Sequence, residues 1–515
     1  MVKGSSGLPL PAIQLEASSY VPLYRQLYEE LRKGILTGRL PPGMRLPSTR
    51  DMARGLSLAR NTVMNAYDQL LAEGYVEGHV GSGTYVTRSL PDDLLYTREN
   101  SHRVLQLSQK GRSFSRRGAV LTSTPVNASP NPSNIRPFWP GIPALDAFPS
   151  KVWSRLVSRY WENPCAKLLG YGDSAGYPQL REAISIYLGA ARAVRCTPDQ
   201  VIITSGRQQA FDLVMRVLLD PGDAAWIEDP GYMGVRAALI SAGGRPVPVP
   251  MDKEGLDVRA GETLYQDARL AYVSPSHQYP LGVTMSLARR LALLEWANRS
   301  GAWIIEDDYD SEYRYTGRPL SALQGLDDQG RVIYLGTFSK VLFPALRLGY
   351  LVVPPDRVAS FVNARAVLSR FSPSIDQAVL ADFINEGHFS RHVRRMRDLY
   401  NKRQKTLIQA LNSELHDLIE VQPDEAGLHL VGWLPEYFDD VVASSSAAAQ
   451  GVDAQPLSAF SINRMGRGGL VLGYAGYDKH QVWEGARRLA SALRHLTVAK
   501  KFQSNTADVA GGTYV

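Results

Sequence analysis

One lysine stands out in the segment GTFSKVLFPALRLGY, residues 336–350. Lys340 lies between a serine and an apolar run, and Arg347 follows in the same segment. Apolar surroundings disfavour the charged form of an amine and so lower its pKa. A neutral lysine amine is the form that attacks an aldehyde. Lys340 is therefore a candidate for bonding an aldehyde cofactor, provided that the sequence also offers the other groups such a cofactor needs.

A ring-shaped aldehyde cofactor with a phosphate needs three further kinds of group. A carboxylate keeps the ring nitrogen protonated, an aromatic face stacks on the ring, and a helix N-terminus with nearby hydroxyls and cations binds the phosphate. The sequence offers Asp307 or Asp308 and then Tyr309 in AWIIEDDYDSEY, Tyr232 in EDPGYMG, and, for the phosphate, Ser205, Gly206, Arg207, Gln208, Thr337, Ser339 and Arg347. Each motif alone is more often a solvated lysine, a helix cap or a packed turn, but their combination and order favour a cofactor site.

These residues must be positioned by a fold, and the pattern over residues 136–498 predicts one. Short runs rich in β-branched residues, such as QVIITSG, AAWIEDP and RVIYLGTFS, alternate with helical patterns. Strands separated by helices are typical of an α/β domain with a mainly parallel sheet. We therefore expect an α/β body over this range.

A second pattern, over residues 20–86, predicts three helices and a hairpin. Apolar residues recur at every fourth position from Leu23 to Ile35, as in an amphipathic helix. PSTRDMARGL begins a second helix with Ser48 as its cap, and ARNTVMNAYDQLLAEG forms a third. YVEGHVGSGTYV then has two short β-type runs around a glycine-rich turn. This order of elements indicates a winged helix-turn-helix domain.

In a helix-turn-helix domain, the second helix of the motif enters the major groove of DNA. The expected base-reading residues are Arg60, Asn61, Thr62 and Asn65, with Arg50 on a phosphate and His79, Ser82 and Thr84 on the wing. The charge of the region, with eight basic and six acidic residues, does not by itself exclude a small domain that binds protein instead.

The remaining segments and the composition indicate the domain boundaries and the cellular location. The chain of 515 residues is too long for one core, so we expect disordered ends at 1–19 and 499–515 and a linker at 87–135, which is rich in Ser, Arg, Pro and Asn. Two cysteines and no zinc-type spacing argue against disulfides and metal. With neither a signal peptide nor an apolar run long enough to span a membrane, we expect a cytoplasmic protein.

Residues 20–86 closely resemble the GntR-type winged helix in the motifs G-x-L-x-x-G-x-x-L-P-S-x-R, R-N-T-V-x-x-A-Y and G-S-G-T-Y-V. The resemblance implies binding to double-stranded operator DNA. One departure concerns the recognition helix, because Ala59 stands where the family usually has a capping serine. Losing such a cap costs roughly 0.5–2 kcal/mol. Either Ser57 caps the helix instead, or its first turn frays until DNA binds.

Residues 136–498 resemble the pyridoxal-phosphate-dependent aminotransferases of fold type I. The resemblance implies that Lys340 forms a Schiff base with pyridoxal 5'-phosphate, that Asp307 pairs with the ring nitrogen, and that Tyr309 binds the phenolic oxygen. Asp308 stays the second choice for the ring nitrogen. The resemblance further implies that Tyr232 stacks on the ring and that Ser205, Gly206, Arg207, Thr337, Ser339 and Arg347 surround the phosphate.

A GntR-type head, a linker and an aminotransferase-like body together resemble the MocR/GabR family of bacterial transcription regulators. Further matching stretches are YGDSAGYPQLREAIS, SPSHQYPLGVTMS and GHFSRHVRRMRDLYNKRQKTL. The resemblance implies a homodimer that regulates genes in response to the cofactor, an amine or an amino acid.

Two positions depart from the aminotransferase pattern. Leu472 stands in GGLVLGYAGY where these enzymes commonly have the arginine that binds the substrate α-carboxylate, and a leucine cannot pair a carboxylate. The segment SHQYPLG lacks the usual asparagine and offers His277 and Gln278 instead. Arg236, Arg464 and Arg467 are other candidate anion anchors, although surface solvation is the simpler explanation. The departures favour the cofactor itself, or an unusual amine, as the effector.

Three functions remain in competition. The first is a transcription regulator that senses the cofactor or an amine at Lys340. The second is an active aminotransferase that also carries a DNA-binding head, and the departure at Leu472 argues against it. The third is a DNA-binding protein whose body only dimerises, and the retention of Lys340, Asp307 and Arg347 together argues against that.

Overall fold

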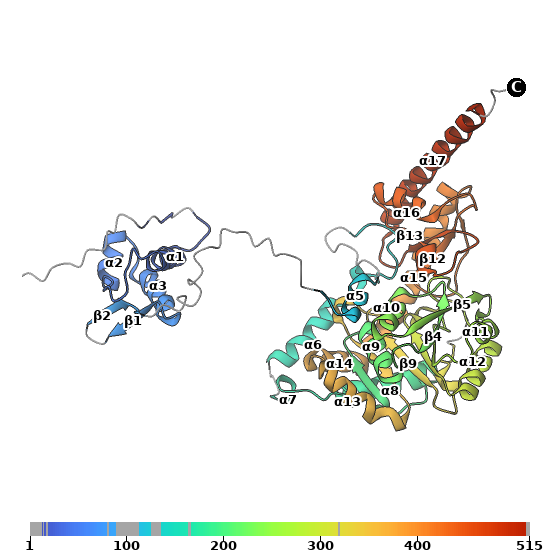
Figure 1. Cartoon of the computed structure of the whole chain (residues 1–515), viewed down its shortest axis with the longest axis horizontal. Coiled ribbons are helices and arrows are strands. Elements are labelled where there is room, and N and C mark those ends of the chain that lie inside the picture. The colour runs from blue at the N-terminus through green and yellow to red at the C-terminus, as the bar shows by residue number, and fades with distance from the viewer. Residues whose placement is uncertain are drawn as a thin grey trace, which may run out of the picture. The chain divides into compact units, whose positions relative to one another are not determined.

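The computed structural model describes residues 13, 15–16, 19–79, 82–88, 113–124, 135–162, 166–317 and 320–510 (Figure 1). The chain divides into two compact units, Met1–Ser113 and Phe114–Val515. The expected disordered N-terminus therefore lies almost wholly outside the described residues. Among the described residues, no helix combines the length and the apolar character that a membrane span needs.

The first unit contains the predicted winged helix-turn-helix. Its elements are α1 Leu23–Leu36, α2 Thr49–Leu56, α3 Arg60–Ala72, β1 Val76–His79 and β2 Gly83–Val86. The apolar face of α1 packs against α3, and Leu27, Val63 and Leu70 are fully buried between them. The two strands pair as an antiparallel hairpin in which Val76 faces Val86. The prediction of three helices and a wing is confirmed.

Helix α3 begins without a side-chain cap. Ala59 occupies the N-cap position and makes no capping hydrogen bond. The alternative that Ser57 caps the helix is wrong, because Ser57 ends α2 in the left-handed conformation, with φ 54°. The first turn of α3 therefore keeps backbone N–H groups that a capping side chain would otherwise bind.

The second unit is built on an eight-stranded mixed sheet whose central strands are parallel, which agrees with the predicted mainly parallel α/β sheet. Its strand order is β3-β10-β9-β8-β7-β4-β5-β6. Strands β9, β8, β7, β4 and β5 are parallel neighbours, whereas β10 is antiparallel to both β3 and β9. The bounds are β3 Val201–Thr204, β4 Ala224–Asp229, β5 Arg245–Asp252, β6 Gly255–Leu256, β7 Leu270–Val273, β8 Trp303–Asp308, β9 Val332–Thr337 and β10 Gly349–Val352.

Helices cover both faces of this sheet. Ile305 packs with α9 Arg207–Leu218, α10 Met233–Ala242 and α13 Val358–Ser369 on one face. Its neighbour Ile304 packs with α11 Val258–Leu264 and α12 Leu287–Ser300 on the other. Because side chains alternate along a strand, consecutive residues at the end of β8 must also face opposite sides.

A smaller antiparallel sheet, of order β11-β12-β14-β13, completes the body. Its strands are β11 Glu420–Val421, β12 His429–Trp433, β13 Gln455–Pro456 and β14 Gly469–Gly473. The remaining helices are α6 Ser150–Glu162, α7 Ala166–Leu169, α8 Pro178–Arg192, α14 Ser374–Asn385, α15 His388–Leu415, α16 Asp440–Ala449 and α17 Lys479–Ala510.

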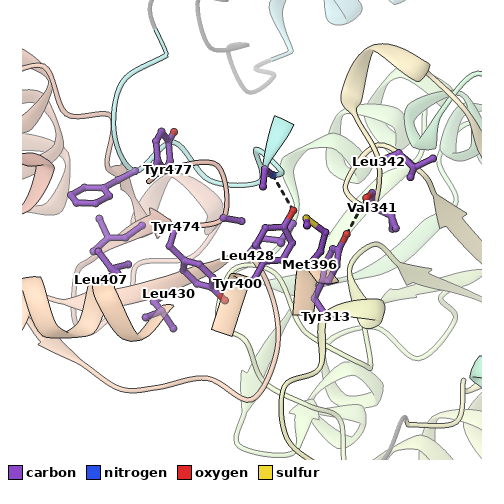
Figure 2. Packing of buried hydrophobic residues seen from close by; sticks show 14 of the residues in the cluster. Tyr313, Val341, Leu342, Met396, Tyr400, Leu407, Leu428, Leu430, Tyr474 and Tyr477 are labelled. Carbon is purple, nitrogen blue, oxygen red and sulfur yellow. Dashed lines mark hydrogen bonds between the residues drawn. The ribbon is translucent and has the colours of Figure 1, made fainter. Parts of the chain in front are cut away.

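The core between the two sheets also supports the lysine segment (Figure 2). Tyr313 and Tyr400 meet edge to face with their ring centroids 4.8 Å apart. The Tyr313 hydroxyl donates to the carbonyl oxygen of Val341 at 3.0 Å, and the Tyr400 hydroxyl accepts from the amide of Ala144. Since Val341 directly follows Lys340, this packing fixes the backbone that carries the amine.

Two expected boundaries need correction. The linker expected at 87–135 contains a helix, α5 Arg116–Ser123, which packs against α10. Ser115 caps α5, and the Arg117 guanidinium donates to the carbonyl oxygen of Ala242 at 2.8 Å, at the C-terminus of α10. Residues 89–112 and 125–134 of the expected linker lie outside the described residues.

The C-terminal boundary also differs from the expectation. Regular structure was expected to stop at residue 498, but α17 continues to Ala510. Between Leu493 and Ala510 the sequence has no glycine or proline to end a helix, and Gly511 and Gly512 follow. Residues 511–515 lie outside the described part.

Candidate functional site

Lys340 lies just beyond the carboxyl end of β9, on a half-buried turn. Its Nζ donates to the carbonyl oxygen of Gly141 at 2.7 Å. Burial, and then the positive charge of Arg207, lower the pKa of the amine to about 8. Gly141 has a φ of 78°, and a side chain there would place its Cβ 2.5 Å from Nζ. The loop around Gly141 therefore leaves room for a reactive amine.

Asp307 is the next-to-last residue of β8 and lies on the face that α9 covers. Its Oδ2 accepts hydrogen bonds from the Tyr272 hydroxyl at 2.7 Å and from Arg207 Nη1 at 3.1 Å. Burial raises the pKa of this carboxyl group, while Arg207 and Tyr272 oppose the rise. Its other oxygen, Oδ1, has no hydrogen-bond partner among the described residues although it is buried. That free oxygen can accept a proton donor from a bound ring.

Asp308 faces the opposite side of the sheet. Its Oδ2 pairs with Arg192 Nε at 2.8 Å and accepts from the Tyr334 hydroxyl at 2.5 Å. Strand alternation separates the two neighbouring carboxylates and engages Asp308 in a different buried network. This arrangement leaves Asp307 as the carboxylate that pairs with Arg207, whose charge also lowers the pKa of Lys340.

Tyr309 is held by a buried histidine that lies between two carboxylates. His277 Nδ1 lies 3.0 Å from the Tyr309 hydroxyl and 3.1 Å from Asp310 Oδ2, and its Nε2 lies 3.1 Å from Asp424 Oδ2. Burial opposes a charge on His277, but Asp310 and Asp424 raise its pKa well above the usual value. The charged imidazole therefore fixes the position of the Tyr309 hydroxyl.

Tyr232 occupies the N-cap position of α10 without a capping hydrogen bond, and it presents its ring to Arg207. The guanidinium carbon of Arg207 lies 3.9 Å from the Tyr232 ring centroid and 5.5 Å from that of Tyr309. Gly234 lies directly against Tyr232, and a Cβ there would come within 2.3 Å of the ring. The position of the ring thus depends on a glycine two residues further along the chain.

The expected phosphate-binding residues meet at one edge of the sheet. Thr204, at the end of β3, is paired with Gly349, which is in turn paired with Thr337 at the end of β9. Gly206 has a φ of 90° and precedes the first turn of α9, whose backbone N–H groups have no intrahelical acceptor. A Cβ at Gly206 would lie 3.5 Å from the guanidinium carbon of Arg347. Backbone donors and a cation therefore converge here.

The other residues predicted to bind the phosphate differ in where their side chains are directed. Ser205 exchanges a hydrogen bond of 3.0 Å with Ser372, and the amide of Ser339 donates to Thr337 Oγ1 at 3.2 Å. The Arg207 side chain differs from the expectation. It is directed at Asp307 and Tyr232, so only its backbone remains at the helix N-terminus.

These residues fit pyridoxal 5'-phosphate. The free buried Oδ1 of Asp307 suits the protonated nitrogen of a pyridine ring, and the Gly206 turn with Arg347 suits a phosphate dianion. Lys340 supplies an amine whose pKa is low enough for reaction with an aldehyde. The donor set therefore matches each part of that cofactor.

The departure at Leu472 is buried in the structure. Leu472 lies in β14, is fully buried and pairs with Leu430 of β12. No carboxylate-binding cation can arise at this position. Of the other anion candidates, Arg467 donates to the carbonyl oxygen of Leu434 and pairs with Glu420 at 2.8 Å.

Sequence reasoning missed Gly141, Tyr272 and Arg45. Tyr272 stands in an otherwise apolar buried strand, and its need for a hydrogen-bond partner was a usable signal. Gly141 is distant in sequence from Lys340, and no local pattern indicated their contact. In the head, Arg45 lies against the wing, where a Cβ at Gly83 would come within 2.9 Å of its Nε.

The predicted DNA-reading residues lie on the surface of the head. Arg60, Asn61 and Asn65 are exposed along the N-terminal half of α3, and Thr62 is half-buried beside them. Arg50 is exposed in the first turn of α2. On the wing, Ser82 is exposed, Thr84 is half-buried, and the exposed His79 packs edge to face on Tyr85 with centroids 5.4 Å apart.

Comparison with known proteins separates the same two regions. Residues 146–489 match the aminotransferase class I and II family, and residues 23–86 match the gntR family of bacterial regulatory proteins. The chain is 43% identical over 482 residues to the probable rhizopine catabolism regulatory protein MocR of Rhizobium meliloti, covering 94% of this chain and 96% of that protein. It is 32% identical to PdxR, the HTH-type pyridoxine biosynthesis transcriptional regulator of Corynebacterium glutamicum, covering 88% and 92%.

Solved structures resemble the body. The α-aminoadipate aminotransferase LysN of Thermus thermophilus, complexed with N-(5'-phosphopyridoxyl)-L-leucine, is 31% identical with a TM-score of 0.65, covering 70% of this chain and 92% of LysN. The multiple substrate aminotransferase of Thermococcus profundus is 29% identical with a TM-score of 0.67, covering 74% and 97%. The chain therefore belongs to the MocR/GabR-type transcription regulators, in which a GntR-type DNA-binding domain is joined to a pyridoxal-phosphate-binding domain of the class I and II aminotransferases.

Proposed function

We propose that this regulator responds to pyridoxal 5'-phosphate, or to an amine without an α-carboxylate, through Lys340. The bound cofactor supplies an aldehyde that captures amines and a ring that withdraws electrons. Lys340 offers its neutral amine to the aldehyde, and Asp307 Oδ1 holds the proton of the ring nitrogen. The observation that carries the proposal is that Lys340, Asp307 and the Gly206 turn all lie at the carboxyl ends of strands of one sheet, in a chain that also has a winged helix-turn-helix.

The remaining contacts divide between the ring and the phosphate. Tyr309, fixed by His277, donates its hydroxyl to the phenolic oxygen, and Tyr232 stacks on the ring. The proposed phosphate contacts come from Ser205, Gly206, the backbone of Arg207, Thr337, Ser339 and Arg347. Arg347 supplies the charge, because no hydrogen bond or ion pair joins its guanidinium to another described residue.

Leu472 supports an effector that is not an ordinary α-amino acid. A buried α-carboxylate without a cation is several kcal/mol less stable than a paired one. The strand that would supply this cation carries a fully buried leucine. Two relatives are named as a probable rhizopine catabolism regulatory protein and a pyridoxine biosynthesis transcriptional regulator. A catabolic amine and the cofactor itself are therefore the candidate signals for this chain.

For the head, we propose that α3 reads an operator in the major groove. Arg60 suits guanine, and Asn61 or Asn65 suits adenine, because these side chains match the acceptor and donor patterns of those bases. Arg50 is placed at the first turn of α2, where a phosphate contact is expected. These roles put the protein in the cytoplasm of a bacterial cell, with the chromosome.

The body is also proposed to form a homodimer. Large apolar side chains are exposed on α6, α7, the turn after α7 and α13: Trp161, Leu169, Tyr171, Val367 and Leu368, here together called the α6–α13 surface. Tyr171 is 86% exposed although it is a large aromatic residue. Three of these side chains, Trp161, Leu169 and Tyr171, line a groove together with Val157, Phe371 and Ile375. Exposed apolar patches of this kind mark interfaces.

A working aminotransferase is the second candidate function. It is favoured by similarity to enzymes, for example 31% identity over 367 residues to the 2-aminoadipate transaminase of Thermus thermophilus. Steady-state production of keto acid from an amino donor and a keto acceptor would support it, and Leu472 predicts that common α-amino acids give none.

The deciding experiment measures operator binding by the full-length protein while cofactor and amines are added. The operator is selected from random duplexes with the protein itself. We expect pyridoxal 5'-phosphate or one amine to change the affinity, and Lys340→Ala to abolish that change. Lys402→Ala serves as the control, because Lys402 is a lysine on α15, away from the site. If Lys340→Ala responds as the wild type does, the body is a scaffold and the proposal fails.

A further inference from the structure

Arg207 occupies an unusual place for the first residue of a helix. Its side chain is only 14% exposed, and it turns inward to pair with the fully buried Asp307. At the same time its guanidinium covers one face of Tyr232, with the guanidinium carbon 3.9 Å from the ring centroid. The guanidinium also lies 5.5 Å from the ring of Tyr309.

These three neighbours are the residues proposed above to hold the cofactor ring, so the inference rests on those roles. A pyridine ring stacked on Tyr232 needs the ring face that the guanidinium covers. Its protonated nitrogen needs the carboxylate of Asp307, which already neutralises one cation. Two cations beside one buried carboxylate repel each other strongly, because the surroundings screen charge poorly.

We propose that the Arg207 guanidinium and the cofactor ring are alternative occupants of the space between Tyr232 and Asp307. Binding of the cofactor then requires Arg207 to leave the face of Tyr232, and it weakens the pairing of Arg207 with Asp307, whose free Oδ1 receives the ring nitrogen. The protein thereby lowers its own affinity for the cofactor, and the site fills only when the free cofactor is abundant. Arg207 is thus a residue that sets the affinity of the site, rather than a clamp on the phosphate.

The alternative role predicts the opposite effect. If Arg207 binds the phosphate, its loss removes a charge-assisted contact and weakens cofactor binding. Arg347 provides the matched control, because it is an arginine beside the same Gly206 turn but has no ion pair within the described residues. Truncation of Arg207 should therefore raise the affinity for the cofactor, whereas truncation of Arg347 should lower it.

The test uses pyridoxamine 5'-phosphate, which has no aldehyde, so binding does not depend on the state of Lys340. Its dissociation constant is measured by quenching of tryptophan fluorescence in the full-length wild type, Arg207→Ala, Arg207→Met and Arg347→Ala. We expect about three- to thirtyfold tighter binding for Arg207→Ala, because a desolvated cation–π contact no longer competes. Arg207→Met, which keeps much of the side-chain length, should fall between the wild type and Arg207→Ala. Arg347→Ala should bind at least about tenfold more weakly.

A second readout follows the cofactor concentration at which operator binding changes, and the proposal expects a lower midpoint for Arg207→Ala. Equal or weaker binding of pyridoxamine 5'-phosphate by Arg207→Ala would overturn the proposal. Thermal unfolding checks that each variant is folded, and Arg207→Met carries the test if Arg207→Ala is not. Failure of the wild type to bind any cofactor would instead overturn the proposed function, so the two failures are distinct.

Discussion

Burial and neighbouring charges set the chemistry of individual residues in the body. Lys340 loses much of its basicity, and its pKa falls to about 8, because it is buried and lies near Arg207. His277 gains basicity, because Asp310 and Asp424 outweigh the effect of burial. The site thus keeps one reactive amine and one fixed imidazolium at neutral pH.

The pKa of Lys340 predicts how cofactor uptake depends on pH. Only the neutral amine bonds the aldehyde, and with a pKa of about 8 roughly a tenth of it is neutral at pH 7. We expect the rate of uptake to rise about tenfold per pH unit below about pH 8 and then to level off. Stopped-flow absorbance with pyridoxal 5'-phosphate measures this rate, with Lys340→Ala as the control for non-covalent binding. A rate that keeps climbing towards the ordinary lysine pKa would contradict the prediction.

Glu228 predicts a pH dependence of stability. Burial raises its pKa to about 7, although Ser274 and Gln278 donate hydrogen bonds to it. A carboxyl group with a raised pKa in the folded state stabilises the fold below its unfolded pKa, and this stability is lost as the pH rises through about 7. The shift corresponds to roughly 3 kcal/mol. Glu228→Gln should therefore flatten the fall in melting temperature between about pH 5 and 8.

The control for Glu228 is Glu295→Gln, whose carboxylate is exposed on α12. Scanning calorimetry at several pH values compares the two variants with the wild type. An unchanged slope in Glu228→Gln would show that this carboxyl group is ionised in the folded protein throughout the range.

At the scale of elements, function is concentrated where strands and helices end. Lys340, Asp307 and Gly206 all follow or end strands at the same edge of the large sheet. The residues proposed to read DNA lie at the beginning of α3, where Ala59 provides no cap. In the body, core packing fixes the residues at the ends of the strands. In the head, the N-terminus of α3 has no capping side chain.

A cap on α3 should therefore stabilise the head. In Ala59→Ser, a serine hydroxyl accepts from the backbone N–H groups of the first turn, which is worth roughly 0.5–2 kcal/mol. Hydrogen exchange of the full-length protein should show slower exchange of the amides of α3. Ala72→Ser, in the last turn of the same helix, is the control and should not slow it. Unchanged exchange in Ala59→Ser would mean that α3 is already fixed by its packing on α1.

Elements with strong local signals could be predicted from the sequence. The winged helix and the parallel strands were predictable because apolar spacing and glycine or proline punctuation mark their limits. Helix α5 was not predictable, because its eight residues lie in a polar stretch. The helix is held in place by the hydrogen bond from its Arg117 to Ala242 of α10, which is distant in sequence. The direction of Arg207 was also not predictable, since its choice between a phosphate and Asp307 depends on a contact across the fold.

At the scale of the whole molecule, the α6–α13 surface is the feature that the isolated chain does not explain. A dimer buries such side chains and gains about 25 cal/mol for each Å² of apolar area. A homodimer would also bring two heads to one operator, which suits the paired half-sites that dimeric helix-turn-helix proteins read.

Charges on this surface should separate the protomers. The double variant Leu169→Glu with Val367→Glu places carboxylates at two exposed apolar positions, and burying them unpaired would cost several kcal/mol. We expect sedimentation velocity to show monomers and operator affinity to fall. Leu291→Glu, an exposed leucine of α12, is the control and should remain dimeric. A double variant that sediments as the wild type does would place the interface elsewhere.

The packing of α5 on α10 also limits the length of the linker between the head and the body. Because Arg117 holds α5 to the body, the covalent span from the end of the wing runs from Arg88 to Ser113, not to residue 135. About 25 residues reach at most about 90 Å even when fully extended. With base pairs spaced about 3.4 Å apart, that reach equals roughly 26 base pairs. Inserting or deleting residues before α5 would therefore change the largest spacing between operator half-sites that a dimer could reach.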